Sequence, residues 1–136
     1  MTHTYQLDGV QHCYGSRCVV DLPALEVRTG EILGIVGPSG AGKSTLLRLL
    51  NFLEPPTRGR LIYRGTEMGP EVPLALRREV VTVFQQPVLL RRSVLANVRI
   101  GQRLRGLPRS SRDAEQWLER LGLSDLAHAP ARTLSA

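Results

Sequence analysis

The stretch Gly37-Pro38-Ser39-Gly40-Ala41-Gly42-Lys43-Ser44 decides the fold of this chain of 136 residues. It fits the pattern G-x-x-x-x-G-K-[ST], in which glycines let the backbone curl so that successive N–H groups point at phosphate oxygens. Lys43 adds a compact positive charge, and a helix beginning there adds its positive N-terminal end. The Ser44 hydroxyl suits Mg²⁺, and Thr45 can contact a further phosphate. We therefore expect a site for the phosphates of a nucleotide, most simply ATP with Mg²⁺.

The segments on either side of this loop have the character that the pattern requires. Residues 31–36 (EILGIV) are apolar on both faces, which is typical of a buried parallel strand. Residues 44–52 place four leucines on a wide apolar face of a predicted helix. Lys43 is also the only lysine among 18 basic residues, as expected where a compact ammonium is needed and a guanidinium would not fit. The context therefore favours a phosphate site over a chance match.

The rest of the chain alternates predicted strands and helices and then becomes wholly helical. Two strands surround a turn at Tyr14-Gly15-Ser16, and a β-branched run at residues 80–84 predicts a second buried strand. Ser110 is the expected N-terminal cap of the last helix. The sequence thus predicts a βα core at residues 1–91 and a helical piece at 92–136. The expected elements are strands at 5–12, 18–22, 24–27, 31–36, 60–63 and 80–84, and helices at 44–52, 73–79, 93–105 and 111–121.

The composition excludes several classes of protein. The hydrophobic fraction of 42% is that of a globular chain, and no stretch approaches the roughly 20 apolar residues of a membrane-spanning helix. The N-terminus lacks the basic start and apolar core of a signal peptide, so we expect a cytoplasmic protein. The net charge of +6 comes from scattered arginines. Nucleic-acid binding would require a stripe of charges with stacking aromatics, so no nucleic-acid partner is expected.

The two cysteines, Cys13 and Cys18, flank the turn at Gly15-Ser16. A disulfide between them is conceivable, but a cytoplasmic environment disfavours it. A metal site would need further ligands at suitable spacing, and only His12 is near. We therefore expect both cysteines to be ordinary small side chains.

Several motifs, in register and in order, resemble the ATP-binding subunits of ABC transporters. The last of them, Leu134-Ser135-Ala136, resembles the start of that family's signature loop, usually Leu-Ser-Gly-Gly-Gln. No other P-loop family combines these elements, so the resemblance is specific and covers nearly the whole chain. The matching stretches are Tyr14-Gly15, residues 25–32, residues 34–47, Gly59 before a short strand, Val83-Phe84-Gln85-Gln86-Pro87, and Leu134-Ser135-Ala136.

This resemblance implies a P-loop NTPase of the α/β class. It implies a RecA-like core, an N-terminal antiparallel β subdomain and the start of an α-helical subdomain. Tyr14 matches the aromatic residue that stacks on adenine, although a partly buried turn tyrosine is the alternative. Gln85 matches the glutamine that contacts Mg²⁺ and the attacking water, although a capping glutamine at a strand end is the alternative. Gln86 fits less well, because the family's glutamine directly follows the apolar-Phe pair.

The same resemblance implies a transport ATPase. Two such subunits would sandwich two ATP molecules, with Ser135 of one contacting the ATP held by Lys43 and the phosphate loop of the other. Closure of the pair would drive transmembrane permease subunits, and an extracytoplasmic solute-binding protein would complete the complex. We expect a peripheral protein on the inner face of the cell membrane, and the short, unfused start favours import. Ala136 in place of glycine also occurs in some importers of oxyanions of the tungstate and phosphate type, a faint hint of substrate.

The chain departs from the family pattern towards its C-terminal end. The family's full signature loop, its apolar run ending in Asp-Glu and its switch histidine are absent, since His128 precedes the signature position. We therefore expect a chain truncated before the Walker B strand, without the glutamate that positions water. Central strands between residues 31–36 and 80–84 would also be missing, leaving unpaired edges. The alternative function is a nucleotide-binding module without hydrolysis.

Other P-loop classes fit the sequence less well. A GTPase should contain Asn-Lys-x-Asp, which cannot occur because the only lysine lies in the phosphate loop. A small-molecule kinase would not explain Gln85 and the helical piece. Chromosome-handling and repair ATPases continue from such a core into long coiled coils, and none begins here.

Overall fold

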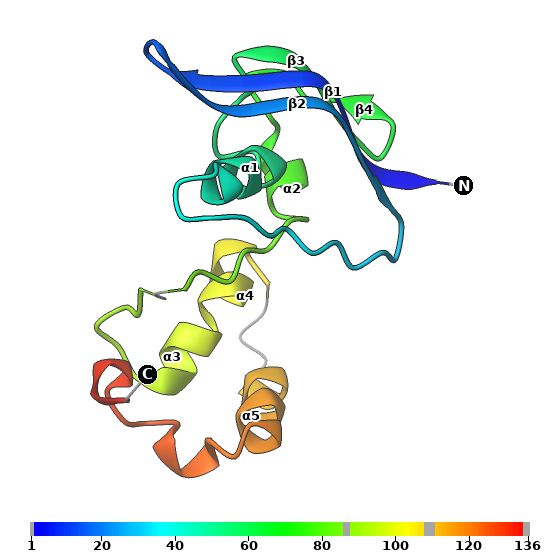
Figure 1. Cartoon of the computed structure of the whole chain (residues 1–136). Helices are drawn as coiled ribbons and strands as arrows, with labels where there is room; N and C mark the ends of the chain where they lie inside the picture. The colour runs from blue at the N-terminus through cyan, green and yellow to red at the C-terminus, as the bar shows by residue number, and fades with distance from the viewer. Residues whose placement is uncertain (1, 86–87, 108–110, 135–136) are drawn as a thin grey trace. The chain divides into compact units, whose positions relative to one another are not determined.

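The computed structural model describes residues 2–85, 88–107 and 111–134. It forms two compact units, Met1–Thr82 and Val83–Ala136. The first unit combines an antiparallel sheet with two helices, whereas the regular elements described in the second unit are helices (Figure 1). Among the described helices, none is long and apolar enough to cross a membrane.

A long β-hairpin forms the base of the first unit. β1 (His3–Tyr14) and β2 (Arg17–Arg28) pair in antiparallel fashion along their whole length. β3 (Arg58–Tyr63) pairs with the other edge of β1, and β4 (Thr66–Glu67) pairs with β3, which gives the order β2-β1-β3-β4. The strands predicted around the turn and at 60–63 are therefore confirmed.

The third strand predicted at residues 24–27 is wrong as a separate element, because these residues continue β2. Pro23 interrupts the sequence pattern at this point but not the strand. β2 lies at the edge of the sheet, where a residue without an N–H group is tolerated.

An irregularity in the middle of β1 keeps both halves of the strand facing one core. Gly9 has a φ of 56°, and the pairing of β1 with β3 shifts register here. The buried side chains change from an odd position, Leu7, to an even one, Val10. Gly59 of β3 crosses at the same place with a φ of 82°, and a Cβ on it would lie 2.2 Å from the Gly9 carbonyl oxygen. The close approach of the two strands therefore requires glycine at position 59.

Two helices pack on one face of this sheet (Figure 1). α1 (Lys43–Leu50) buries Leu46 and Leu49 against it, and α2 (Leu74–Arg77) follows Pro73 and adds Leu76 to the edge of the core. The helices predicted at 44–52 and 73–79 are thus confirmed in shorter form. The core consists of Leu7, Val10, Val20, Leu46, Leu49, Phe52, Leu61, Tyr63 and Met68.

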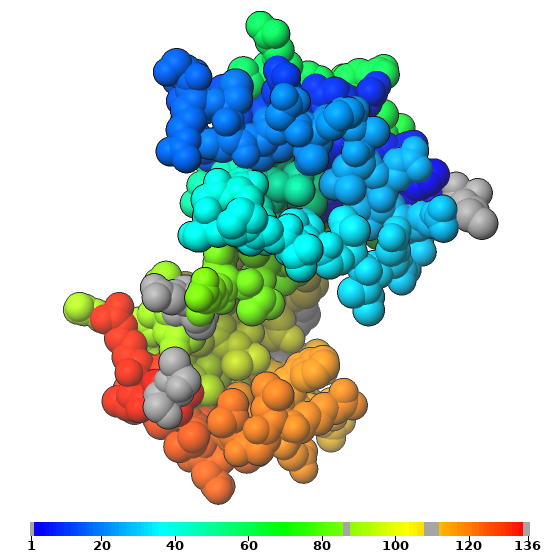
Figure 2. All heavy atoms as spheres, viewed as in Figure 1, coloured from blue at the N-terminus to red at the C-terminus, as the bar shows by residue number. Residues whose placement is uncertain are grey.

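The two segments predicted as buried parallel strands do not form strands. Residues 31–36 and 80–84 have no regular secondary structure, and Ile32 and Val83 are 98% and 91% exposed. Figure 2 shows the light-blue to cyan segment that contains residues 31–36 at the surface of the first unit. A strand needs a neighbour for its N–H and C=O groups. The only sheet in the described ranges provides none for either segment, so both predictions are wrong for this chain.

The second unit is a cluster of short helices. It contains α3 (Val94–Val98), α4 (Ile100–Leu104), α5 (Ser111–Arg120) and the single 3₁₀ turns η1 (Ser124–Leu126) and η2 (Ala131–Thr133). The segment predicted as helical at 93–105 is confirmed as helical, but it forms two short helices separated by Arg99 instead of one. The β-branched Val98 and Ile100, followed by Gly101, are weak helix formers.

The helix predicted at 111–121 is confirmed as α5, but only some of its apolar side chains are buried. Ala114 and Leu118 lie in the core of this unit, whereas Trp117 and Leu121 are exposed. The cap predicted at Ser110 lies outside the described residues. The helices start at Val94, close to the expected start of the helical piece; the division into domains at 91/92 stays a prediction.

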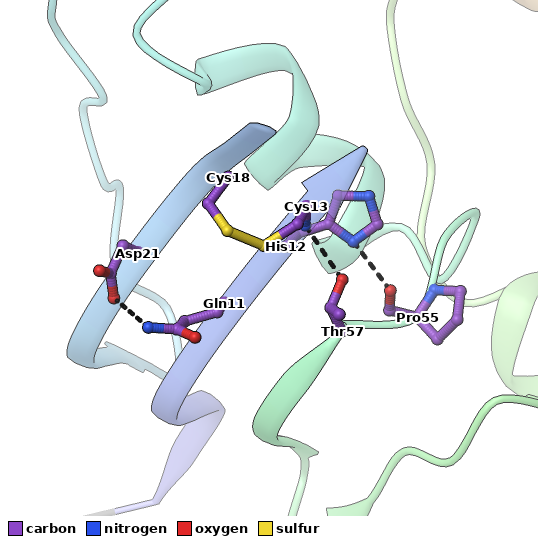
Figure 3. The surroundings of a disulfide bond; sticks show 7 residues. All are labelled: Gln11, His12, Cys13, Cys18, Asp21, Pro55 and Thr57. Carbon is purple, nitrogen blue, oxygen red and sulfur yellow. Dashed lines mark hydrogen bonds between the residues drawn. A yellow bond between two sulfur atoms is a disulfide. The ribbon is translucent and has the colours of Figure 1, made fainter. Parts of the chain in front are cut away.

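Cys13 and Cys18 are joined by a disulfide bond (Figure 3). They face each other on β1 and β2 beside the two-residue turn, with their Cα atoms 3.8 Å apart. The expectation of two ordinary small side chains is therefore wrong. The argument against a disulfide rested on the redox environment alone, whereas the pairing of the strands brings the two sulfur atoms together.

Candidate nucleotide-binding site

The phosphate loop leads directly into α1. The helix begins at Lys43 and is preceded by Gly42, whose φ of 82° lies in the left-handed region. In the described structure no side chain caps this end, and the first turn carries no acidic residue. The N–H groups of the first turn therefore remain available to another partner. A helix end of this kind attracts anions.

Gly42 is also in close contact with the hairpin. A Cβ at this position would lie 2.1 Å from the carbonyl oxygen of Val19 and 3.5 Å from the side chain of Val20. Glycine is therefore required both for its conformation and for its contact with β2. Gly40 has the same φ of 82° but has open space around it, so only the conformational requirement applies there.

The side chain of Lys43 folds back over the loop. Its Nζ donates hydrogen bonds to the carbonyl oxygens of Gly37, at 2.8 Å, and Pro38, at 2.7 Å. The N–H of Ala41 donates to Pro38 at 3.3 Å and closes a turn within the loop. An ammonium group has three donors, so a third remains for a ligand after the two carbonyl bonds. The loop thus holds a positive charge close to its own backbone.

A hollow of about 230 Å³ lies between the loop and the hairpin. Ser44, at the first turn of α1, is exposed, whereas Thr45 is buried. The exposed hydroxyl of Ser44 could serve as a ligand of a cation. The phosphate contact expected of Thr45 stays a prediction. The hollow is lined by residues 19–22, Ile35, Val36, residues 41–43 and Leu46.

Tyr14 lies at the end of β1 with 45% of its surface exposed. Its hydroxyl donates to Glu54 Oε2 at 2.5 Å and accepts a hydrogen bond from Arg48 Nη1 at 3.4 Å. Arg48 belongs to α1, five residues after Lys43, which corresponds to about 7.5 Å along the helix axis. The structure therefore brings the tyrosine ring and the phosphate loop to the same helix.

Three residues that hold Tyr14 were not singled out from the sequence: His12, Arg48 and Glu54. The ring of His12 meets that of Tyr14 edge-on at 4.8 Å, and its Nδ1 lies 3.0 Å from the Pro55 carbonyl oxygen. Its Nε2 is 3.1 Å from Glu54 Oε2, although the two atoms are not aligned as a hydrogen bond. His12 shares a strand face with Tyr14 because the two are two residues apart. This spacing could have indicated His12 as a neighbour of Tyr14 from the sequence. No sequence pattern indicates Arg48 or Glu54 as neighbours of Tyr14.

The remaining predicted site residues are not part of this arrangement. Gln85 is an exposed residue of the second unit, so its role stays a prediction. Gln86 and Ser135 lie outside the described residues. Nowhere in the described ranges do three His, Cys, Asp or Glu side chains come together as a metal site would require. The roles of Ser44 and Gln85 as Mg²⁺ ligands stay predictions.

The chain belongs to the ABC transporter family, whose model matches residues 21–136. The methionine import ATP-binding protein MetN of Geobacillus kaustophilus (strain HTA426) is 42% identical over an aligned length of 132 residues, and the match covers 92% of this chain and 38% of MetN. The phosphonates import ATP-binding protein PhnC of Rhizobium etli is 38% identical over an aligned length of 145 residues, and the match covers 96% of this chain and 52% of PhnC.

A solved structure shows the same fold. The structure of cbiO1 from Clostridium perfringens, part of the ABC transporter complex cbiONQ, superposes with a TM-score of 0.83 at 25% identity. The match covers 99% of this chain and 57% of cbiO1. The chain thus spans less than two thirds of each of these three proteins. The predicted family and the predicted P-loop NTPase fold with an N-terminal antiparallel β subdomain are confirmed.

Proposed function

We propose that the chain is the ATP-binding part of an ABC transporter and couples ATP binding and hydrolysis to solute import. One observation carries the proposal: Tyr14 and the phosphate loop meet on α1. Lys43 begins the helix, and Arg48 of the same helix holds the Tyr14 hydroxyl. A flat, half-exposed ring suits a base, and an uncapped helix end with an ammonium group suits phosphates.

In this proposal each part of the nucleotide has its own partner. The backbone N–H groups at the start of α1 hold phosphate oxygens, and Lys43 places its charge on the β- and γ-phosphates. Tyr14 stacks on adenine, with its hydroxyl fixed by Glu54 so that the ring keeps one orientation. Ser135 is proposed to contact the ATP bound by a second copy of the subunit.

Mg²⁺ fits the residues at the start of α1. It prefers oxygen ligands, and the exposed Ser44 hydroxyl at the start of α1 provides one beside the phosphate loop. Gln85 is proposed as a second ligand, through its amide oxygen. The ion would supply neutralisation of the negative charge on the phosphates during transfer. The residues of this chain bind and orient the nucleotide.

The ABC family hydrolyses ATP, but we propose that residues 1–136 by themselves bind without hydrolysing. They contain no Asp-Glu pair that could hold Mg²⁺ and position the attacking water. Because this pair is missing, the second candidate function is a nucleotide-binding module without hydrolysis.

The names of the relatives support a place in an import complex. MetN and PhnC are named as import ATP-binding proteins, and cbiO1 is described as part of a transporter complex. We propose that the partners here are transmembrane permease subunits, a second ATP-binding subunit and an extracytoplasmic solute-binding protein. The proposed location is the cytoplasmic face of the membrane.

Calorimetric titration with ATP and Mg²⁺ tests the proposal. Lys43→Ala is expected to abolish detectable ATP binding, because it removes the charge on the phosphates. Arg60→Ala is the matched control: it also removes one positive charge, but from β3, where Arg60 forms an exposed ion pair with Asp8 of β1, and it should bind ATP as the wild type does. Equal binding by both variants would contradict the assignment. Phosphate release by residues 1–136, abolished in Lys43→Ala, would contradict the proposed inactivity.

A further inference from the structure

The Cys13–Cys18 disulfide joins two strands that each carry part of the candidate nucleotide site. Cys13 directly precedes Tyr14 on β1. Cys18 directly precedes Val19 on β2, and the carbonyl oxygen of Val19 lies against Gly42 of the phosphate loop. The cross-link therefore connects the strand that carries the aromatic ring to the strand that supports the loop.

The pairing of the strands is irregular at this point. His12 opposes Val20, whereas Cys13 opposes Cys18, so Val19 has no opposing residue on β1. An extra residue of this kind disrupts the ladder and bends the strand. The hydrogen-bond ladder alone therefore fixes the end of the hairpin less firmly than its middle, and the disulfide supplies the missing constraint.

Breaking the disulfide should act locally. β1 is paired with β2 on one side and with β3 on the other, which holds most of its length. The two cysteines are only five residues apart, and closing so short a loop removes little chain entropy from the unfolded state. We therefore expect reduction to loosen the end of the hairpin while the sheet remains folded.

The bond is also open to chemical attack. Cys18 is exposed and Cys13 is partly exposed on the same hairpin. These are the only two cysteines among residues 1–136, so no other thiol in these residues competes for either sulfur. Thiol–disulfide exchange depends on such access.

We propose that Cys13 and Cys18 form a thiol–disulfide exchange site whose redox state sets nucleotide affinity through the position of Tyr14. The partner is a low-molecular-weight thiol or a dithiol protein. This inference rests on the proposed ATP-binding function, because it needs Tyr14 to contact the base. The oxidised form binds the nucleotide more tightly, since the cross-link holds the ring in place before the base arrives.

The exchange is balanced as follows. A thiolate of the reductant attacks Sγ of the exposed Cys18, the Cys13–Cys18 bond breaks, and Cys13 leaves as a thiolate that takes up a proton. A second thiol of the reductant attacks its own sulfur in the mixed disulfide and releases Cys18 as the thiol. Two electrons and two protons pass to the protein, and the reductant becomes a disulfide.

The test compares oxidised and dithiothreitol-reduced protein, using the full-length chain, with free thiols counted by alkylation and mass spectrometry. Affinities are measured for ATP and for tripolyphosphate, which has no base. Reduction should weaken ATP binding about three- to tenfold, in line with partial loss of base stacking, and should leave tripolyphosphate binding unchanged. Cys13→Ser with Cys18→Ser should bind like the reduced protein at any redox state. Tyr14→Ala should bind ATP weakly and equally in both forms.

The other outcomes overturn the inference in distinguishable ways. Equal ATP affinity in the two forms of the wild type would show that the redox state does not reach the site. Equal weakening of ATP and tripolyphosphate would show that it acts on the phosphate loop and not through Tyr14. If the protein still has two free thiols after oxidation, then no disulfide forms and there is no exchange site. Absence of ATP binding in both forms would overturn the proposed function, and this inference with it.

Discussion

Gly42 shows how one residue can satisfy two requirements at once. Its φ of 82° is strained for any residue with a side chain, and its contact with Val19 leaves no room for a Cβ. The glycine thereby fixes both the start of α1 and the distance between the phosphate loop and β2. The motif predicts the first of these requirements, and only the structure shows the second.

We expect Gly42→Ala to destabilise the first unit more than Gly30→Ala does. Both residues have left-handed φ values, of 82° and 80°, but only Gly42 would place its Cβ against a carbonyl oxygen, at 2.1 Å. The conformation alone costs alanine about 1–2 kcal/mol, and the overpacking at position 42 adds about 1–3 kcal/mol. Urea unfolding of the two variants measures the difference. Equal losses would show that the contact with Val19 is unimportant.

The hydroxyl of Tyr5 should make stability depend on alkaline pH. Burial raises the pKa of Tyr5 from 10.0 to about 12, with a smaller contribution from Tyr63 and an opposing one from Arg64. The unfolded chain therefore loses this proton first, so the stabilisation is fully present below pH 10 and is lost as pH rises towards about 12.

The comparison of wild type with Tyr5→Phe isolates this effect. Phenylalanine cannot ionise, so the fall in the free energy of unfolding above pH 10 should be less steep in the variant. Below pH 10 the variant should be less stable by about 0.5–1.5 kcal/mol, because it loses the 3.0 Å hydrogen bond from Tyr5 to the Leu50 carbonyl. Parallel pH profiles for the two proteins would contradict the role given to Tyr5.

Among the elements, β1 and β3 approach each other closely where Gly59 crosses Gly9. Gly59→Ala would bring a Cβ to 2.2 Å from the Gly9 carbonyl oxygen, whereas Gly65→Ala, at a similar φ of 78°, meets open space. We expect Gly59→Ala to lose at least about 1 kcal/mol more than Gly65→Ala, because the strands must move apart. Amide hydrogen exchange should show faster exchange along β3 in Gly59→Ala only. Unchanged protection of β3 in both variants would contradict this view of the crossing.

Element by element, the sequence predicted what local pattern determines and missed what depends on distant neighbours. The leucine periodicity and the glycine motif were sufficient for α1 and the phosphate loop. The apolar runs at 31–36 and 80–84 were recognised, but strand formation depends on neighbouring strands, which the runs themselves do not reveal. The hydrogen bond between Tyr14 and Glu54 joins residues 40 positions apart, and no local sequence pattern predicts such a pair.

For the molecule as a whole, the exposed apolar segments are the main liability. Ile32 and Val83 are nearly fully exposed. An exposed apolar segment whose backbone N–H and C=O groups have no strand partner promotes association with other chains. We expect the polypeptide of residues 1–136 to bind hydrophobic dyes strongly and to aggregate on heating. A protein that binds no hydrophobic dye and stays soluble on heating would contradict this expectation.

Two conservative variants test the origin of that aggregation. Ile32→Thr with Val83→Thr should reduce dye binding and aggregation with little loss of stability, since these side chains make few contacts to lose. Val10→Thr likewise replaces an alkyl group by a hydroxyl, but in the buried core, and should instead destabilise the first unit by about 1–3 kcal/mol. If Val10→Thr reduced aggregation, or if Ile32→Thr with Val83→Thr did not, the exposed apolar segments would not be its cause.

Lys43 carries the only side-chain amine among residues 1–136, and its Nζ is hydrogen-bonded to the phosphate loop, which has a practical consequence. An acylating reagent directed at lysine can modify one side chain per molecule, and a protease specific for lysine has one peptide bond to cut, between residues 43 and 44. That bond lies in the first turn of α1. Its rate of modification or cleavage therefore reports, without any engineered label, whether the phosphate loop is occupied.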